Sequence, residues 1–416
     1  MPHVVQQLRP VRHPVEAAPG ETVLNVALYP YVPRPDQFES VVTGAWGALY
    51  PDVGLNFVDY NCYANDPDAS LDVFAFDCIY TSYFLSKNFL MKLSSEQLGD
   101  VSDFFPWALA ACQGGDGSYY AIPYLGCAYC LIYRSGDTAL DQALSLSAVY
   151  DVIGNAPPDQ TPPPANQGLI LDLTGATTDS CFYLETYEEI ENSYGWDPPL
   201  PQPNALDSQV IVDLQTLRNM AGFYGAAYRD PGDARVSWFL QGFGRALVGP
   251  TETLAHFLPP SVIEATKLHV LPFDQQRQDQ PFYVDALGVN SQIDPSKVQY
   301  AVAFANLVAG VQVMFQALVP DPNSTSPTAP NPQYLMPARQ SVLAKFASNW
   351  EAYEQIQNIV TFHTGSAFRI GSTSRSWLNS TKAAICAAIF DGQQVCEPEQ
   401  PHPALTHLPV NLMRRV

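Results

Sequence analysis

The sequence predicts an α/β protein built from two lobes with a ligand cleft between them. The chain has 416 residues, enough for two or three domains. Short apolar runs of strand length alternate with segments of helical periodicity along the chain. These elements are too many for one sheet, and Pro-rich breaks separate them at 155–168, 196–204, 320–333 and 397–403.

The composition restricts the classes of partner. Twenty Lys and Arg stand against 41 Asp and Glu, a formal charge of −21, although only 15% of the residues are charged. A net-negative chain without a basic stripe repels phosphate, so we expect no nucleic-acid partner and a preference for cationic ligands. The 22 tyrosines favour the same ligands, because aromatic faces attract cations.

The first eighty residues predict a parallel βαβ unit. Asp36 and Glu39 have the spacing of a helix capping box. A strand, a helix and a further strand within so few residues require a parallel pair of strands. The predicted elements are strands at 23–29, 55–58 and 71–76 and a helix at 38–49.

Polar and aromatic residues follow the predicted strands. Tyr29 and Tyr31 close the first strand, Asp59 and Tyr60 the second, and Asp77 the third. Each one alone is equally typical of an ordinary turn. Because open parallel sheets bind ligands at the carboxyl ends of their strands, the set of three strand ends predicts a binding site there.

One stretch, residues 300–319, contains 20 residues without a charge. Its polar residues, Asn306, Gly310, Gln312 and Gln316 among them, favour a buried helix over a membrane span. We therefore expect no membrane span.

The eight cysteines are irregularly spaced, and a chain of this length is no disulfide scaffold. Cys127 and Cys130 form a C-x-x-C pair, but no second pair completes a zinc site. A redox site of the thioredoxin type would need its first cysteine at the start of a helix, whereas residues 122–133 are predicted to be extended. The sequence contains no phosphate-binding or metal motif, so we expect neither metal nor cofactor.

Cys127 is the nucleophile candidate, because it lies in the extended segment that joins the two halves. A lone cysteine is also commonly a small buried apolar residue, and that interpretation stays open. Glu252, at a predicted strand end, is the candidate base. Since a nearby anion raises a thiol pKa, Glu252 would act only if burial raised its own pKa.

Eleven short motifs occur in a fixed order between about residues 23 and 388. They are V-A-L-Y-P-Y-V-P (26–33), L-D-V-F-A-F-D (71–77), I-P-Y-L-G-C (122–127), L-I-Y-R-S-G-D (131–137), P-P-P-x-N-Q-G-L-I (162–170), S-W-F-L-Q-G-F-G-R-A (237–246), T-E-T (251–253), P-F-Y-V-D (281–285), P-Q-Y-L-M-P-A-R (332–339), F-R-I-G (368–371) and S-W-L (376–378). In this combination the chain resembles the bacterial thiaminase I (thiamine pyridinylase) family.

The resemblance implies the two-lobed, periplasmic-binding-protein-like (type II) fold. It divides the chain into an N-terminal extension, two discontinuous lobes and a C-terminal tail. The expected ranges are 1–22 for the extension, 23–130 plus about 275–325 for lobe 1, 131–274 plus about 326–390 for lobe 2, and 391–416 for the tail.

The resemblance also assigns site residues. The family's nucleophilic cysteine falls on Cys127 and its catalytic glutamate on Glu252. Its acidic and aromatic pocket falls on Asp77, Asp285, Tyr283, Tyr29, Tyr31 and Tyr63, which are expected to bind substrate. The sequence departs from the family pattern at Pro250, Tyr60 and Cys78, which stand where the family has Tyr, Trp and a small polar residue.

The implied reaction is a transfer of an alkyl group without metal or cofactor. Cys127 adds to C6 of the thiamine pyrimidine while Glu252 takes the thiol proton. The adduct expels the thiazole from the bridging methylene, and an amine, a pyridine-type base or a thiol then attacks that carbon.

Two further questions stay open on the sequence. A non-catalytic thiamine- or pyrimidine-binding protein of a transporter would share the fold, but would have no use for Cys127 and Glu252. The second question is the location of the protein. Residues 1–22 hold no apolar run long enough for a signal peptide, which favours the cytoplasm if the chain is complete. The resemblance instead implies a secreted or periplasmic protein. We expect a monomer.

Overall fold

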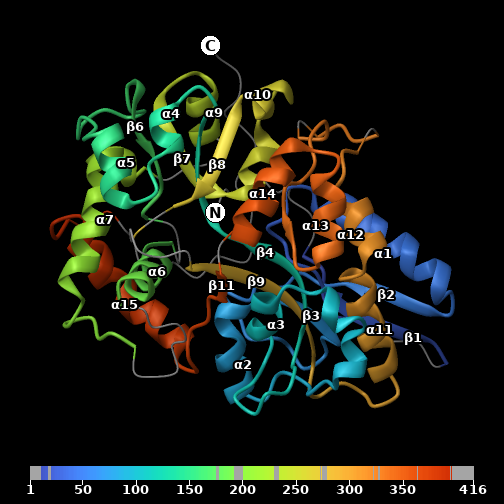
Figure 1. Cartoon of the computed structure of the whole chain (residues 1–416). Helices are drawn as coiled ribbons and strands as arrows, with labels where there is room; N and C mark the ends of the chain where they lie inside the picture. The colour runs from blue at the N-terminus through green and yellow to red at the C-terminus, as the bar shows by residue number, and fades with distance from the viewer. Residues whose placement is uncertain are drawn as a thin grey trace, which may run out of the picture.

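A computed structural model confirms an α/β fold with two sheets (Figure 1). It describes residues 11–16, 20–174, 178–191, 200–228, 234–271, 273, 279–321, 323–326, 328–362, 364–393 and 395. The seven-stranded sheet has the order β10-β4-β9-β3-β1-β2, with β11 paired to β9. Its strands are β1 Thr22–Ala27, β2 Val53–Phe57, β3 Val73–Asp77, β4 Ile122–Cys127, β9 Asp279–Val289, β10 Met336–Pro337 and β11 Thr364–Ala367.

The second sheet has four strands in the order β6-β7-β5-β8. These are β5 Tyr129–Arg134, β6 Ala165–Ile170, β7 Gly244–Pro250 and β8 Thr266–Val270. A single residue, Ala128, separates β4 in the larger sheet from β5 in the smaller one. The predicted extended run at 122–133 is therefore two strands that pass directly from one sheet to the other.

The helices pack around both sheets, as Figure 1 shows. In chain order they are α1 Pro35–Leu49, η1 Cys78–Tyr80, α2 Thr81–Ser86, η2 Ser95–Leu98, η3 Val101–Asp103, α3 Pro106–Ala111, α4 Thr138–Asp141, α5 Leu146–Ile153, α6 Thr178–Glu191, α7 Ser208–Ala221, α8 Phe223–Ala226, α9 Ala234–Leu240, η4 Thr251–His256, α10 Ser261–Glu264, α11 Val298–Val308, α12 Val311–Leu318, α13 Gln340–Ala347, α14 Glu351–Phe362 and α15 Ser374–Ile389.

The predicted βαβ unit is present. Strand β1 pairs in parallel with both β2 and β3, and α1 connects β1 to β2. The buried face of α1 consists of Phe38, Val42 and Trp46, which recur at helical spacing. The parallel pairing brings the carboxyl ends of the three strands to one edge of the sheet.

Two local predictions are wrong. The capping box does not form, because α1 begins at Pro35, whose fixed φ suits the first helical position, and Asp36 falls inside the first turn. The predicted helix at 300–319 is two helices, α11 and α12, which meet at 51° because Gly310 has an extended backbone between them. Within the described residues, no single helix is long and apolar enough to cross a membrane, and these two pass that test only as a bent pair.

The residue ranges assigned to the lobes remain a prediction. Strands β10 and β11, which lie in the range expected for lobe 2, pair in the larger sheet with β4 and β9. Most of the extension at 1–22 and of the tail at 391–416 lies outside the described residues.

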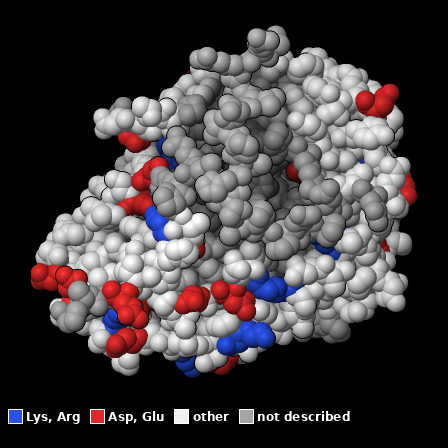
Figure 2. Space-filling view, turned by 180° about the vertical axis from the view of Figure 1, so that it is seen from behind, with Lys and Arg blue, Asp and Glu red and all other residues white. Residues whose placement is uncertain are grey.

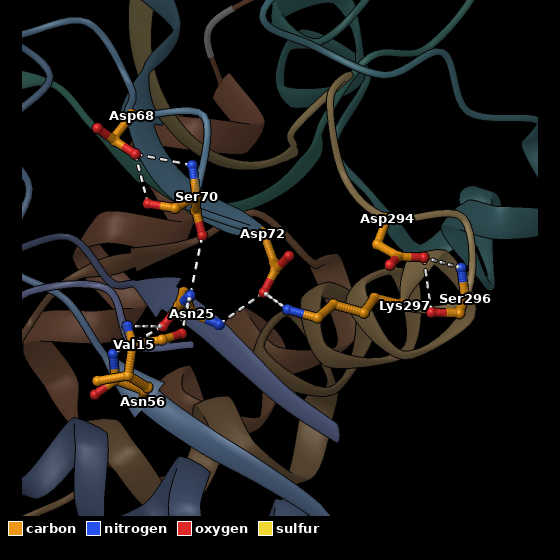
Figure 3. A network of polar contacts seen from close by, with 9 residues as sticks. All are labelled: Val15, Asn25, Asn56, Asp68, Ser70, Asp72, Asp294, Ser296 and Lys297. Atoms are coloured by element: carbon orange, nitrogen blue, oxygen red, sulfur yellow. Dashed lines mark hydrogen bonds and ion pairs between the residues drawn. The ribbon is translucent and has the colours of Figure 1, made fainter. Parts of the chain in front are cut away.

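A buried polar network fixes the amino end of β3 (Figure 3). The Asp72 carboxylate accepts hydrogen bonds from the Asn25 backbone N–H at 2.8 Å and from Lys297 Nζ at 3.0 Å. The Asn25 side chain accepts from Val15 N–H at 2.9 Å and from Asn56 Nδ2 at 2.8 Å. Val15 also accepts a hydrogen bond from Asn25 Nδ2 at 3.1 Å, so the network holds this part of the N-terminal segment against the sheet.

The surface is acidic but mixed. In Figure 2, the described part of the visible face shows Lys and Arg beside Asp and Glu, most of them along its lower edge, without a continuous basic surface. Pairs such as Lys92 with Asp116 and Arg12 with Glu39 are examples of this mixing.

The close approach of Trp107 to Gly126 gives a stability prediction. A Cβ added at Gly126 would lie 2.5 Å from Trp107 Cη2, next to Cys127. We expect Gly126→Ala to destabilise the protein by about 1–3 kcal/mol, the usual cost of overpacking, in a denaturant titration.

The matched control is Gly47→Ala in α1. Gly47 is exposed, and an added Cβ there has no neighbour within 4 Å. This change should leave stability unaltered or increase it by about 0.5–1 kcal/mol. Equal effects of the two substitutions would contradict the packing argument.

Candidate functional site

Cys127 is the last residue of β4, at the point where the chain passes from one sheet to the other. Its partner on the neighbouring strand β9 is Tyr283. The side chain is half-buried. Burial first, then the negative charge of Glu252, holds the pKa of the Cys127 thiol well above its ordinary value. The thiol is therefore protonated near neutral pH and needs a base to react as a thiolate.

Glu252 approaches the same place from the smaller sheet. It lies in η4, which follows β7 directly, and Pro250 at the end of β7 pairs with Tyr129 at the start of β5. Burial raises the pKa of Glu252 to about 7. Among the described residues, none hydrogen-bonds to its Oε2 atom. A desolvated carboxylate with an unused oxygen has the properties of a general base.

Asp77 and Asp285 are direct partners on the antiparallel strands β3 and β9. Burial raises the pKa of Asp77 to about 6, although hydrogen bonds from Ile79 N–H and Tyr63 oppose this. Burial and then the charge of Asp77 raise the pKa of Asp285 well above its ordinary value. Two adjacent buried carboxyl groups do not both ionise, so at neutral pH the pair retains a proton and offers one donor beside acceptor oxygens.

The three N-terminal tyrosines form a layer beside Asp77. Tyr63 OH donates to Asp77 Oδ2 at 2.8 Å, and the Tyr29 and Tyr63 hydroxyls are 2.8 Å apart. The Tyr31 ring lies 5.4 Å from that of Tyr29 and 5.9 Å from that of Tyr63, centroid to centroid. Tyr63 and Tyr29 are thus connected to the Asp77 carboxylate by a chain of hydrogen bonds, and the Tyr31 ring packs on both.

Tyr283 is the partner of Cys127 on β9 and contacts the helical layer. Its hydroxyl donates to Glu185 Oε2 on α6 at 3.0 Å. Its ring lies 5.8 Å from that of Tyr129 and 4.6 Å from that of Phe368. The residue that pairs with Cys127 is therefore hydrogen-bonded to a carboxylate of α6.

Comparisons with known proteins bear on this arrangement. The chain is 33% identical over 377 residues to the thiaminase-1 of Paenibacillus thiaminolyticus, covering 89% of each protein. This chain belongs to the thiaminase I family. The Thiaminase-1 domain model matches residues 128–273.

Solved structures agree with this assignment. The Clostridium botulinum thiaminase I in complex with thiamin is 32% identical, with a TM-score of 0.83, and covers 88% of this chain and 99% of its own. The GacH receptor of Streptomyces glaucescens matches with a TM-score of 0.63 at 13% identity, covering 90% and 95%. The second likeness concerns the fold alone. It confirms the periplasmic-binding-protein-like (type II) fold, while family membership confirms the enzyme class, thiamine pyridinylase.

Sequence reasoning missed several residues of this thiaminase I site. Arg375, at the start of α15, donates to the carbonyl oxygens of Cys62 at 2.8 Å, Tyr63 at 2.9 Å and Asn65 at 3.2 Å. It therefore holds the loop that carries Tyr63. Nothing in the linear sequence connects these segments, which are more than 300 residues apart.

Glu185 was missed although a signal existed. Glu185, Glu188 and Glu189 lie at helical spacing in an otherwise largely uncharged part of α6, and all three are buried. Buried glutamates are rare unless they have a partner or a function. Their burial, however, depends on how α6 packs, which the sequence does not state.

Several of the other described cysteines are buried thiols. Cys130 is a buried free thiol that donates to the Ala128 carbonyl oxygen at 3.7 Å. Cys62, Cys78 and Cys112 are also buried free thiols. Within the described residues, no group of three or more His, Cys, Asp and Glu side chains is arranged to hold a metal ion.

The departures from the family pattern lie around the same site. Pro250 ends β7 just before Glu252, and Cys78 follows Asp77 directly at the start of η1. The Tyr60 ring packs on Phe74 at 5.7 Å between centroids, and its hydroxyl donates to the Asn65 carbonyl oxygen at 3.3 Å.

The raised pKa of Glu252 predicts a dependence of stability on pH. The unfolded side chain ionises near 4.5 and the folded one near 7, so between these pH values the folded protein holds a proton that the unfolded chain has lost. Stability from this group therefore falls as pH rises from 4.5 to 7. Above pH 7 the cost of ionising the buried group is on the order of 3 kcal/mol.

Glu252→Gln removes this cost, so we expect it to raise the melting temperature more at pH 8 than at pH 5. Thermal melts of both proteins at the two pH values measure the difference. The same change in melting temperature at pH 5 and pH 8 would show that Glu252 ionises normally in the folded protein.

Proposed function

We propose that this protein transfers the aminopyrimidine-methyl group of thiamine to a base or thiol and releases the thiazole. One observation carries the proposal: Cys127 ends β4 of the larger sheet, and Glu252 follows β7 of the smaller sheet close to it, because Tyr129 pairs with Pro250. The charge of Glu252 contributes to the raised pKa of the Cys127 thiol. Family membership supports the same reaction, and the relative from C. botulinum is described in complex with thiamin.

In the first step, Cys127 Sγ adds to C6 of the pyrimidine and Glu252 takes the thiol proton. The pKa of about 7 suits Glu252 to this task, because a general base works best when its pKa is near the working pH. An ordinary glutamate would be too weak a base for a thiol whose pKa is raised by burial.

In the second step, the electron-rich adduct expels the neutral thiazole from the bridging methylene. The acceptor then forms a bond to that carbon, the bond between Cys127 and C6 breaks, and Glu252 returns the proton to sulfur. The proton shared by Asp77 and Asp285 matches a ring nitrogen, and their acceptor oxygens match the exocyclic amino group.

The substrate cation suits the surroundings of the site. Tyr29, Tyr31 and Tyr63 present aromatic rings beside a carboxylate, and the chain has a net charge of −21. Ring faces and negative potential both favour a thiazolium. Departure of a neutral thiazole removes this attraction and assists release.

The decisive experiment incubates the protein with thiamine and excess pyridine and identifies the products by mass spectrometry. We expect a pyrimidine-methyl adduct of pyridine and free thiazole. Cys127→Ser should abolish turnover while thiamine still binds in a calorimetric titration, since a serine hydroxyl is a far weaker nucleophile.

The buried Cys130 supplies the control, because Cys130→Ser alters a thiol that the mechanism does not use. A fully active Cys127→Ser protein would refute the covalent mechanism. Tight thiamine binding without products in the unaltered protein would favour the alternative, a substrate-binding protein of a transporter.

The ionisation of Glu252 should appear in the pH profile. The free enzyme needs this group as a carboxylate, so kcat/KM should rise with pH up to about 7 and then level off. Measuring kcat/KM for thiamine from pH 5 to 9 tests this. Glu252→Gln should lower the rate by about 10²–10⁴-fold and abolish the rising limb.

A further inference from the structure

The second half of the proposed reaction raises a question of proton balance. Glu252 takes one proton from Cys127 and returns it when the sulfur departs, so it begins and ends the cycle as a carboxylate. A pyridine acceptor has no proton to lose. A primary amine such as aniline, or a thiol, becomes cationic on attack and must release one proton, which requires a second base.

Glu185 is in a position to supply that base. It lies on α6 and is 0% exposed, and its Oε2 atom accepts a hydrogen bond from Tyr283 OH at 3.0 Å. Tyr283 is the partner of Cys127 in the pairing of β9 with β4. The side chain that pairs with the proposed nucleophile is therefore hydrogen-bonded directly to a buried carboxyl group.

Aromatic packing isolates the connection from solvent. The Tyr129 ring contacts both Tyr283, at 5.8 Å, and Phe182 on α6, at 4.4 Å between centroids. Phe368 covers the Tyr283 ring at 4.6 Å. With water displaced, an acceptor bound here has few routes for losing a proton other than a protein group.

Glu185 and Glu252 both lie near Cys130 on β5. The charges of both carboxylates raise the pKa of the Cys130 thiol, after burial, which is the largest cause. Glu252 comes from η4 of the smaller sheet, whereas Glu185 reaches the site through Tyr283 of the larger sheet. Two buried carboxylates thus flank the reacting segment from different elements.

We propose, on the basis of the function proposed above, that Glu185 receives the proton of a protic acceptor through Tyr283. As the acceptor nitrogen or sulfur bonds to the methylene carbon, its proton passes to the Tyr283 oxygen, and the Tyr283 proton passes to Glu185. The electron pair released at the pyrimidine expels Cys127, which regains its own proton from Glu252. Glu185 then loses its proton to solvent as the product leaves.

The test compares two acceptors in one variant. We expect Glu185→Gln to lower the transfer rate to aniline by roughly 10²-fold, the usual contribution of a general base, while transfer to pyridine stays within about threefold. Single-turnover rates are followed by mass spectrometry of the adducts. Transfer to pyridine also shows that the variant is folded and that the Cys127 chemistry is intact.

The matched control is Glu189→Gln on the same helix. Glu189 is also buried, but its Oε2 atom accepts from the Phe273 backbone N–H at 2.9 Å, a bond that an amide oxygen retains. This variant should change the rates of transfer to aniline and to pyridine by the same factor. If Glu185→Gln does not fold, Tyr283→Phe breaks the same connection. Because Tyr283 is also expected to bind substrate, the readout for that variant is the ratio of the aniline rate to the pyridine rate, which should fall by a similar factor.

Either of two results overturns the proposal: equal slowing with both acceptors, which indicates a structural role, or no slowing with aniline, which indicates another base. Both leave the proposed function intact, because the unaltered protein still transfers to pyridine. Absence of both adducts with the unaltered protein would instead refute the proposed function.

Discussion

The pairing of β9 with β3 and β4 is the constraint on which the site depends. Strand β9 runs antiparallel between the two, so its successive inward residues meet Asp77 on one side and Cys127 on the other. The same backbone hydrogen bonds that build the larger sheet therefore place Asp285 beside Asp77 and Tyr283 beside Cys127. A shift of one residue in this register would turn both pairs to the opposite face of the sheet.

Desolvation gives these residues their chemistry. Burial is the largest cause of the raised pKa in Cys127, Glu252, Asp77 and Asp285 alike. In water, Glu252 would be an ordinary acid and the two aspartates would both be charged. Packing thus creates a base near pH 7 and a proton-sharing pair from three common carboxyl groups, at the expense of stability, as is usual for active sites.

The two sheets contribute unequal parts of this arrangement. The larger sheet carries Cys127, the proposed nucleophile, together with the aspartate pair and the tyrosine layer, whereas the smaller sheet brings Glu252 to the thiol. The direct passage from β4 to β5 through Ala128 makes Cys127 the junction between them. Arg375 adds a second connection, because α15 packs on α6 and α7 while its first turn holds the loop carrying Tyr63.

The sequence by itself determined the fold class, the family and the strands that precede Tyr29 and Asp77, and it predicted 122–133 as one extended run, which the structure divides at Ala128. Periodicity and order along the chain record such features, because strands and helices follow from local patterns of burial. It misplaced the start of α1 and missed the break at Gly310, because at each point the backbone geometry of one residue decides the outcome. Only the tertiary structure decided that Asp285 faces Asp77, that Arg375 holds the Tyr63 loop, and that Glu185 meets Tyr283. These contacts join segments that are far apart in the chain, and the pKa values depend on water that only the packed protein excludes.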